Sequence, residues 1–335
     1  MYSTVKIREN YHKHLRRDIM TQNRKVVLVG AGMVGMSFAY SALNQNLCDE
    51  LHIIDIDKKR AEGEAMDLCH GLAFSGTSMK IYASDYSACR DAAVVVICAG
   101  VNQKEGESRL ALLERNTEVF KNVTDSVLLS GFDGIFLVAT NPVDIMTRVT
   151  GVLTSFPKNR VLGTGTTLDT ARLRYLLGDY FHLDPRNVHA YVMGEHGDSE
   201  FVPWSQALLA TKPVLRVLET NPDRFRKSDL ESIAHEVRTA AQKIISAKRA
   251  TYYGIGMAIT RIVRAILSDA ERVLTVSSEL LGEYGRKSTF VGTPCIVGRN
   301  GVERTIELSL TSEELSAFHN SCDILDESFE SLRLL

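Results

Sequence analysis

KVVLVGAGMVGMSFAYSALN, residues 25–44, is the stretch of this sequence that decides the fold. A lysine and four apolar residues, three of them β-branched, stop at a glycine, as in a strand buried on both faces. Gly30, Gly32 and Gly35 follow in a GxGxxG pattern, and a helical pattern continues to about residue 46. Such glycines permit a tight turn and let a phosphate approach the backbone N–H groups of a helix N-terminus. The stretch predicts a strand, a phosphate-binding turn and a helix.

A GxGxxG pattern alone is weak evidence, and the next predicted strand strengthens it. That strand, residues 50–55, ends in Asp55, twenty residues after Gly35. A carboxylate in this position accepts hydrogen bonds from a ribose diol and repels a 2′-phosphate, so NAD is favoured over NADP as the cofactor. The alternative, an ordinary turn aspartate, does not account for the glycines upstream.

Strands and helices alternate through the first half of the chain. Further strands are expected at residues 80–83, 92–99 and 134–140, and helices at residues 57–69 and 110–130. This alternation predicts a parallel, doubly wound sheet, which binds ligands beyond the carboxyl ends of its strands. Gly100 and Asn141 lie just past two such ends. We therefore expect a Rossmann domain at residues 25–164.

The pattern changes after about residue 164. Long helical patterns appear at residues 167–180 and 229–268, β-rich segments at 272–281, 289–298 and 302–310, and a last helix from Thr311. These elements predict a mixed α+β catalytic domain, residues 165–335, packed on the first domain. The active site is expected between the two domains.

Composition narrows the class of protein. The 335 residues are 44% hydrophobic and 24% charged, with a net charge of −2, which is typical of a globular protein and gives no electrostatic case for nucleic acid or an acidic membrane as partner. The longest apolar stretch, about residues 92–100, is too short to span a bilayer. Six cysteines without CxxC pairs favour a reduced, cytoplasmic location and no structural metal site.

Residues 1–24 are basic and show no core pattern, signal-peptide h-region or convincing transit-peptide composition. We interpret Met20 as the true start, with the preceding residues an upstream artefact. The alternative is a flexible arm that packs on a neighbouring subunit.

Four separated residues have the chemistry to move a hydride and a proton between a nicotinamide and a small 2-keto carboxylate. The Arg172 guanidinium suits a substrate carboxylate, and His196 can donate or accept a proton near neutral pH. Asp169 would orient the imidazole of His196 and stabilise its charged form, while Arg109 would polarise the substrate carbonyl. Each residue alone has an ordinary structural interpretation, so the prediction depends on all four meeting in space.

Six motifs in order resemble the NAD-dependent L-lactate dehydrogenases of the bacterial type, within the lactate and malate dehydrogenase family. They are GAGMVGMSFAY, CAGVNQKEGESRL, ATNPVD, GTTLDTARLR, GEHGDSEFVPWS and ATYYGIGMAI, and the resemblance covers nearly the whole chain from Lys25. It implies reversible reduction of pyruvate to L-lactate in a tetramer and the roles argued above for the four residues. It also implies substrate contacts for Asn141 and Thr251. On the same basis the expected NAD site contains Gly30, Gly32, Val34, Gly35, Asp55, Arg60, Tyr86, Gly100, Val101 and Asn141.

The resemblance extends to the choice of substrate. Malate dehydrogenases share the catalytic set, and the deciding family position corresponds to Gln103, where an arginine would pair with the second carboxylate of oxaloacetate. Glutamine would leave that charge buried and unpaired, at a cost of several kcal/mol, so a monocarboxylate is predicted. The loop from Val101 to Arg109, which contains Gly106, is expected to close over the substrate and expel water.

Two further positions match a regulatory feature and one departs from the family. Arg174 and His189 correspond to residues that bind fructose 1,6-bisphosphate between subunits in activated members, although both are also ordinary structural residues. Arg249 stands where members commonly have glycine, two residues before Thr251, so pocket shape and fine substrate preference are in question.

Two alternatives to an L-lactate dehydrogenase stay open at this point. One is a dehydrogenase of larger L-2-hydroxy acids, because Gln103 excludes a second charge without limiting side-chain size. The other is a non-catalytic NAD-binding or structural protein that retains the fold.

Overall fold

The computed structural model describes residues 24–101 and 109–334. The predicted N-terminal extension, apart from Arg24, and the segment that contains Gln103 therefore lie outside the described residues. Within the described ranges, no helix combines the length and apolar character needed to cross a membrane.

A nine-stranded sheet forms the centre of the molecule, and its first six strands are parallel in the order β3-β2-β1-β4-β5-β6. This order is that of a Rossmann fold, so the predicted doubly wound sheet is confirmed. The strands are β1 (Lys25–Val29), β2 (Glu50–Ile54), β3 (Lys80–Ala83), β4 (Val94–Ile97), β5 (Ile135–Val138) and β6 (Val161–Gly163).

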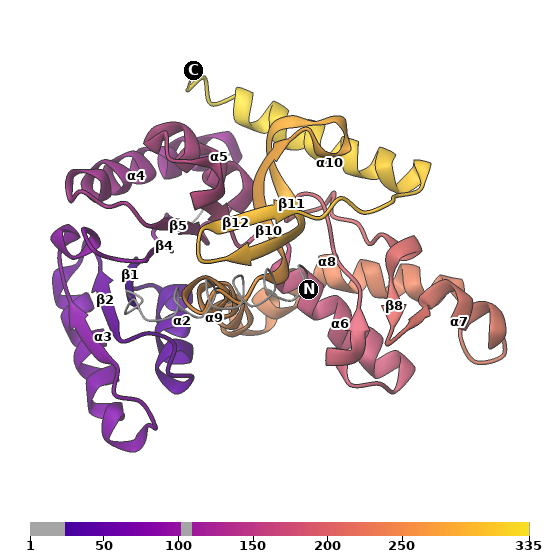
Figure 1. Ribbon diagram of the computed structural model, residues 1–335, viewed down its shortest axis with the longest axis horizontal. Helices are drawn as coiled ribbons and strands as arrows, with labels where there is room; N and C mark the ends of the chain where they lie inside the picture. Colours follow the sequence, from indigo (N-terminus) through magenta and orange to yellow (C-terminus); the bar gives the residue numbers. More distant parts are fainter. Residues whose placement is uncertain (1–23, 102–108, 335) are drawn as a thin grey trace, which may run out of the picture.

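Alternate residues of the strands enter two different cores, one on each face of the sheet. In β1, Val26 and Leu28 pack into the first core, and Val27 and Val29 into the second. The first core is covered by α2 (Met33–Asn44), α3 (Lys58–Gly71) and α9 (Tyr253–Leu267). The second is covered by α4 (Arg109–Leu129), α5 (Val143–Thr154) and α10 (Ser312–Glu330), as Figure 1 shows. Helices on both faces explain why these strands are apolar on both sides.

The β-rich segments of the second half continue the central sheet. The antiparallel strands β10 (Arg272–Leu281), β11 (Lys287–Gly298) and β12 (Gly301–Thr305) join it through the pair Ser277 and Gly163. A Cβ on Gly163 would lie 2.2 Å from Thr147 Oγ1 and 3.1 Å from Ser277 Cβ. The close junction of the two halves therefore requires a glycine at this position. The expected strand at residues 302–310 ends at Thr305.

A third core lies beside the sheet, to the right in Figure 1. It contains α6 (Thr167–Phe181), α7 (Val214–Thr220), α8 (Lys227–Lys248) and a small sheet of β7 (Val188–His189), β8 (Leu208–Leu209) and β9 (Lys212–Pro213). Short 3-10 helices occur at Leu72–Phe74, Tyr86–Cys89, Lys158–Arg160, Pro185–Asn187, Trp204–Gln206 and Glu283–Gly285.

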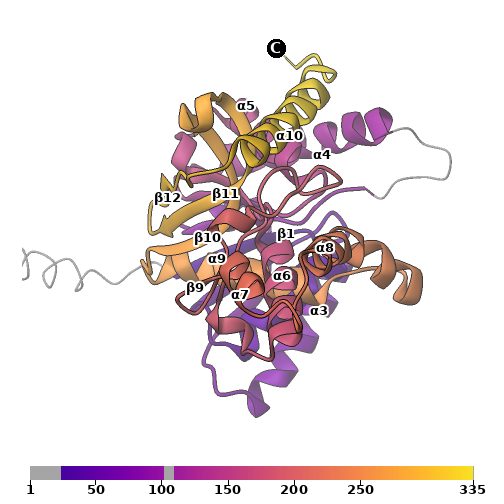
Figure 2. The same ribbon diagram turned by 90° about the vertical axis from the view of Figure 1, so that its right-hand side faces the viewer.

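The helical pattern expected over residues 229–268 is two helices, so the prediction of one continuous pattern is corrected. Helix α8 ends at Lys248 and α9 begins at Tyr253, and the two are seen as separate ribbons in Figure 2. The break occurs because Arg249 has φ 72° and ψ −21°, a left-handed conformation that ends a helix. Arginine does not by itself predict this conformation. The glycine that family members commonly have at this position would predict it.

Candidate active site

The glycine turn after β1 has the shape of a phosphate cradle. Gly30 has φ +106°, and a Cβ there would lie 2.6 Å from the backbone nitrogen of Ala99. A Cβ on Gly35 would lie 2.0 Å from the carbonyl oxygen of Gly30, which shows how closely α2 packs on the turn. Gly32 faces open space, and no side chain caps the N-terminus of α2. The helix therefore presents its first N–H groups to an approaching anion.

Asp55 is fixed beside this turn by its own hydrogen bonds. Its Oδ2 accepts from the backbone N–H of Ala31 at 2.7 Å, and Oδ1 accepts from that of Asp57 at 2.9 Å. Burial and the charges of Cys89 and Asp55 raise the pKa of Tyr86 to about 12. The two hydrogen bonds hold the Asp55 carboxylate beside the glycine turn, where the adenosine side of an NAD site is expected. Val34 is half-buried on α2, and Arg60 is exposed on α3, 3.9 Å from the carboxylate of Glu64.

Asn116 joins the ends of β4 and β5, and sequence reasoning missed it. Its Oδ1 accepts from the backbone N–H of Val101 at 2.8 Å, and its Nδ2 donates to the carbonyl oxygen of Asn141 at 3.4 Å. Gly100 leaves room for this arrangement, since a Cβ there would lie 2.5 Å from Thr140 Cγ2. An asparagine on the face of α4 that carries Leu113 and Phe120 is the signal that could have identified it.

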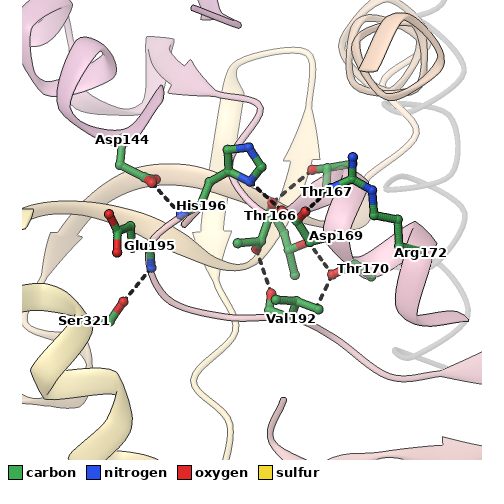
Figure 3. A network of polar contacts seen from close by, with 11 residues as sticks. Asp144, Thr166, Thr167, Asp169, Thr170, Arg172, Val192, Glu195, His196 and Ser321 are labelled. Atoms are coloured by element: carbon green, nitrogen blue, oxygen red, sulfur yellow. Dashed lines mark hydrogen bonds and ion pairs between the residues drawn. The ribbon is translucent and has the colours of Figure 1, made fainter. Parts of the chain in front are cut away.

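The structure brings together three of the four predicted catalytic residues. His196 Nδ1 lies 2.6 Å from Asp169 Oδ2, and Arg172 Nη1 donates to Asp169 Oδ1 at 2.8 Å, as Figure 3 shows. Burial lowers the pKa of His196, but the Asp169 charge and hydrogen bond outweigh burial, so the pKa rises to about 9. The cations around Asp169 hold its own pKa below the usual value despite its burial. The imidazole is thus set up to carry a proton, and the guanidinium keeps further N–H donors for a substrate carboxylate.

Three threonines hold α6 against the segment that leads to His196 and against β10. Thr166 Oγ1 donates to the carbonyl oxygen of Val192 at 2.6 Å, and the N–H of Val192 donates to Thr170 Oγ1 at 2.9 Å. Thr167 Oγ1 donates to the carbonyl oxygen of Thr275 at 2.9 Å. Because Asp169 lies within this anchored first turn of α6, its carboxylate has a fixed direction.

Asp144 and Ser321 fix the backbone beside His196 and were not predicted. Asp144 Oδ2 accepts from the backbone N–H of His196 at 2.8 Å, and Ser321 Oγ accepts from that of Glu195 at 2.6 Å. These residues come from α5 and α10, so the His196 segment is held from both halves of the chain (Figure 3). Asp144 belongs to the quoted motif ATNPVD, which was the available signal.

The other predicted substrate residues lie at the ends of helices and strands or outside the described residues. Arg109 is the first residue of α4, at the boundary of the described segment, and Gln103 lies outside it. Asn141 is exposed at the end of β5, and Thr251 is half-buried in the break between α8 and α9. Arg249 is exposed in the same break.

Both halves of the chain match models of known protein domains. Residues 24–163 match the model of the lactate/malate dehydrogenase NAD binding domain, and residues 166–333 match that of the lactate/malate dehydrogenase alpha/beta C-terminal domain. The chain belongs to the lactate/malate dehydrogenase family. NAD is accordingly its cofactor, which agrees with the glycine turn and the position of Asp55.

Individual members of the family are similar over nearly their full lengths. An L-lactate dehydrogenase of Geobacillus sp. (strain WCH70) is 50% identical over 313 residues, covering 92% of this chain and 98% of that protein. A lactate dehydrogenase enzyme from a Medee basin deep-sea metagenome library has a solved structure with a TM-score of 0.92 and 49% identity, covering 93% of this chain and all of that one. The structure of the minor L-lactate dehydrogenase from Enterococcus mundtii, in its ligands-bound form, has a TM-score of 0.92 and 46% identity. The match covers 94% of this chain and 100% of that chain.

Arg174 and His189, the two residues predicted to bind fructose 1,6-bisphosphate, lie on neighbouring elements. Arg174 on α6 donates from Nε to the carbonyl oxygen of Ala190 at 3.1 Å, and its guanidinium carbon lies 5.2 Å from the centre of the Tyr191 ring. Burial lowers the pKa of Arg174. His189, one residue before Ala190, is exposed at the end of β7. Arg174 is therefore anchored beside the strand that carries His189.

Proposed function

We propose that this protein is an NAD-dependent L-lactate dehydrogenase that reversibly reduces pyruvate to L-lactate, the last step of lactate fermentation. The observation that carries the proposal is the buried Asp169 carboxylate, which binds His196 and Arg172 at once. The names of relatives at about 50% identity over nearly the whole chain support the same activity. The close association of Asp169, Arg172 and His196 argues against a non-catalytic protein.

Each residue of the site has a distinct role in this proposal. His196 Nε2 delivers a proton to the carbonyl oxygen in reduction and removes it in oxidation, while Asp169 stabilises the imidazolium. Arg172 binds the substrate carboxylate, and Arg109 stabilises negative charge that develops on the carbonyl oxygen. Bound NADH supplies the hydride. Asn141 and Thr251 complete the substrate site.

Gln103 is proposed to restrict the substrate to a monocarboxylate. In support, Gln103 stands six residues before Arg109, the first residue of α4, so the two predicted substrate residues are near neighbours in the sequence. Gln103→Arg should raise activity on oxaloacetate at the expense of pyruvate. An unchanged preference would place substrate selection elsewhere.

The decisive assay follows loss of NADH absorbance on adding pyruvate, 2-ketobutyrate, 2-ketoisocaproate or oxaloacetate. We expect the highest kcat/KM with pyruvate and a loss of roughly 1,000-fold in His196→Gln. A higher kcat/KM with 2-ketoisocaproate would favour the second candidate, a dehydrogenase of larger L-2-hydroxy acids, which the exposed Arg249 beside Thr251 keeps open. If NADH absorbance did not fall with any of these keto acids, both candidate functions would be contradicted.

We further propose that fructose 1,6-bisphosphate activates the enzyme through Arg174 and His189 in a homotetramer located in the cytoplasm. Two cationic side chains suit a phosphate, and Arg174 is anchored next to the His189 strand. The six free cysteines fit a reducing compartment. Pyruvate saturation curves with and without the sugar bisphosphate, together with sedimentation analysis, test the proposal. An unchanged curve would remove the activator role.

A further inference from the structure

Glu200 places a second carboxyl group behind the catalytic pair. It follows His196 by four residues and is only 4% exposed. Its backbone is held by two hydrogen bonds: its carbonyl oxygen accepts from Arg238 Nη1 at 3.2 Å, and its N–H donates to the carbonyl oxygen of Gly197 at 3.3 Å. Its Oε1 is buried and has no hydrogen-bond partner among residues 24–101 and 109–334. A buried polar atom without a partner calls for an explanation, and a catalytic role is one of the recognised explanations.

The carboxyl group of Glu200 lies close to both members of the pair. One oxygen each from Glu200 and Asp169 and one ring nitrogen of His196 all lie within 4.8 Å of one another. Such spacing could serve a metal ion, but both oxygens of Asp169 are already engaged, one by His196 and one by Arg172. A cation would have to break these bonds. The geometry therefore favours an electrostatic role for Glu200 within the pair.

The charges around Glu200 decide when it ionises. Burial and the negative charge of Asp169 oppose ionisation, while the positive charges of His196, Arg172 and Arg238 favour it, and the balance raises the pKa of Glu200 to about 8. His196 in turn is influenced by three carboxyl groups, Asp169, Asp144 and Glu200, each of which raises its pKa. Near neutral pH this balance favours the uncharged form of Glu200, while Asp169 and Asp144 provide negative charge beside the imidazolium.

We propose that Glu200 is a positioning residue for proton transfer: its buried carboxyl group, within 4.8 Å of Asp169 and His196 and with an unpartnered oxygen, helps to retain the proton on the His196 imidazole. The inference rests on the proposed role of His196 as proton donor. Glu200 is then the third titrating group of the site, after Asp169 and His196. It acts through His196 and not on the substrate, and it widens the pH range over which pyruvate can be reduced. The Asp169–His196 pair and Glu200 then titrate as one coupled system.

The test compares the wild-type protein with Glu200→Gln, which keeps the shape of the side chain and removes its ionisation. Below about pH 7 the kcat/KM for pyruvate should be nearly unchanged, because Glu200 is mainly uncharged there. The alkaline limit of kcat/KM should move to lower pH by roughly 1 to 2 units, the effect of one buried charge within 4.8 Å of the imidazole. A uniform loss at every pH would indicate a structural role and overturn the proposal, as would an unmoved limit.

A second readout needs no catalysis. Diethyl pyrocarbonate acylates neutral imidazole, so the pH midpoint of His196 labelling, followed by peptide mass spectrometry, reports its protonation. The midpoint should fall in Glu200→Gln, stay near the wild-type value in Glu200→Asp, and stay unchanged in the exposed control Glu236→Gln. An equal midpoint in wild type and Glu200→Gln overturns the role of Glu200, whatever the activity. A shifted midpoint without pyruvate reduction would overturn the proposed function alone.

Discussion

The backbone N–H of His196 donates to Oδ2 of Asp144 at 2.8 Å, so a buried carboxyl group of α5 holds the segment that carries the expected proton donor. Asp144 is 2% exposed, and burial raises its pKa from 3.8 to about 6, although nearby hydrogen bonds and His196 act in the opposite direction. The junction of the two halves thus contains a carboxylate that is costly to ionise.

Asp144→Asn should change how stability depends on pH. An acid whose pKa is raised on folding binds more protons in the folded state, so the free energy of unfolding of the wild-type protein falls as pH rises from about 4 through about 6. Because asparagine does not ionise, the free energy of unfolding of the variant lacks this decrease with pH. Its stability relative to wild type should therefore improve by roughly 1 to 2 kcal/mol between about pH 5 and about pH 7.5. Urea unfolding at fixed protein concentration measures this, with the exposed Asp223→Asn as control, and a difference independent of pH would contradict it.

Asp169→Asn should impair catalysis more than folding. The asparagine removes the charge that raises the pKa of His196 to about 9, so this pKa should fall and the imidazole should lose its proton at lower pH. We expect kcat for pyruvate reduction to drop roughly 100-fold or more, with the alkaline limit of activity moved to lower pH. Steady-state kinetics across pH check both effects. Retained activity with an unmoved limit would show that Asp169 does not act through His196.

Arg172→Lys should weaken substrate binding. The guanidinium donates to Asp169 at 2.8 Å and still has N–H groups for a carboxylate, whereas an ammonium group cannot bind both in the same planar geometry. We expect the KM for pyruvate to rise roughly 10-fold to 100-fold. Each tenfold rise corresponds to a loss of about 1.4 kcal/mol of binding free energy. The matched control is Arg186→Lys, whose side chain is 89% exposed. Equal KM values for the two variants would exclude Arg172 from carboxylate binding.

Arg249→Gly should stabilise the protein. Arg249 ends α8 with φ 72°, a conformation that glycine adopts without the steric penalty of a Cβ. We expect the free energy of unfolding to rise by about 0.5 to 1 kcal/mol, after the greater flexibility of glycine in the unfolded chain is counted. Ala247→Gly, two residues earlier and inside α8, should have the opposite effect by about 1 kcal/mol. Urea midpoints that fall in both variants would contradict the explanation.

Local sequence patterns predicted the Rossmann sheet well. The strand before Gly30, the glycine turn and Asp55 interact mainly with near neighbours, and a strand buried on both faces must be apolar throughout. The capping box at Thr311 and Glu314 likewise marks the start of α10, where the last helix was expected. These features are set by turn geometry, capping and periodicity, which a short window of sequence contains.

The sequence by itself determined five strands and three helices of the first half, the cofactor turn and the residue types of the catalytic set, but neither α5 nor β6. Only the tertiary structure decided which residues support that set: Asn116 across two strand ends, Asp144 behind His196, and Glu200 beside Asp169. It also decided that β10 continues the first sheet at Gly163 and that the chain turns at Arg249. The physical reason is that strand pairing, burial and charge coupling depend on groups that are distant in sequence and meet only when the core packs.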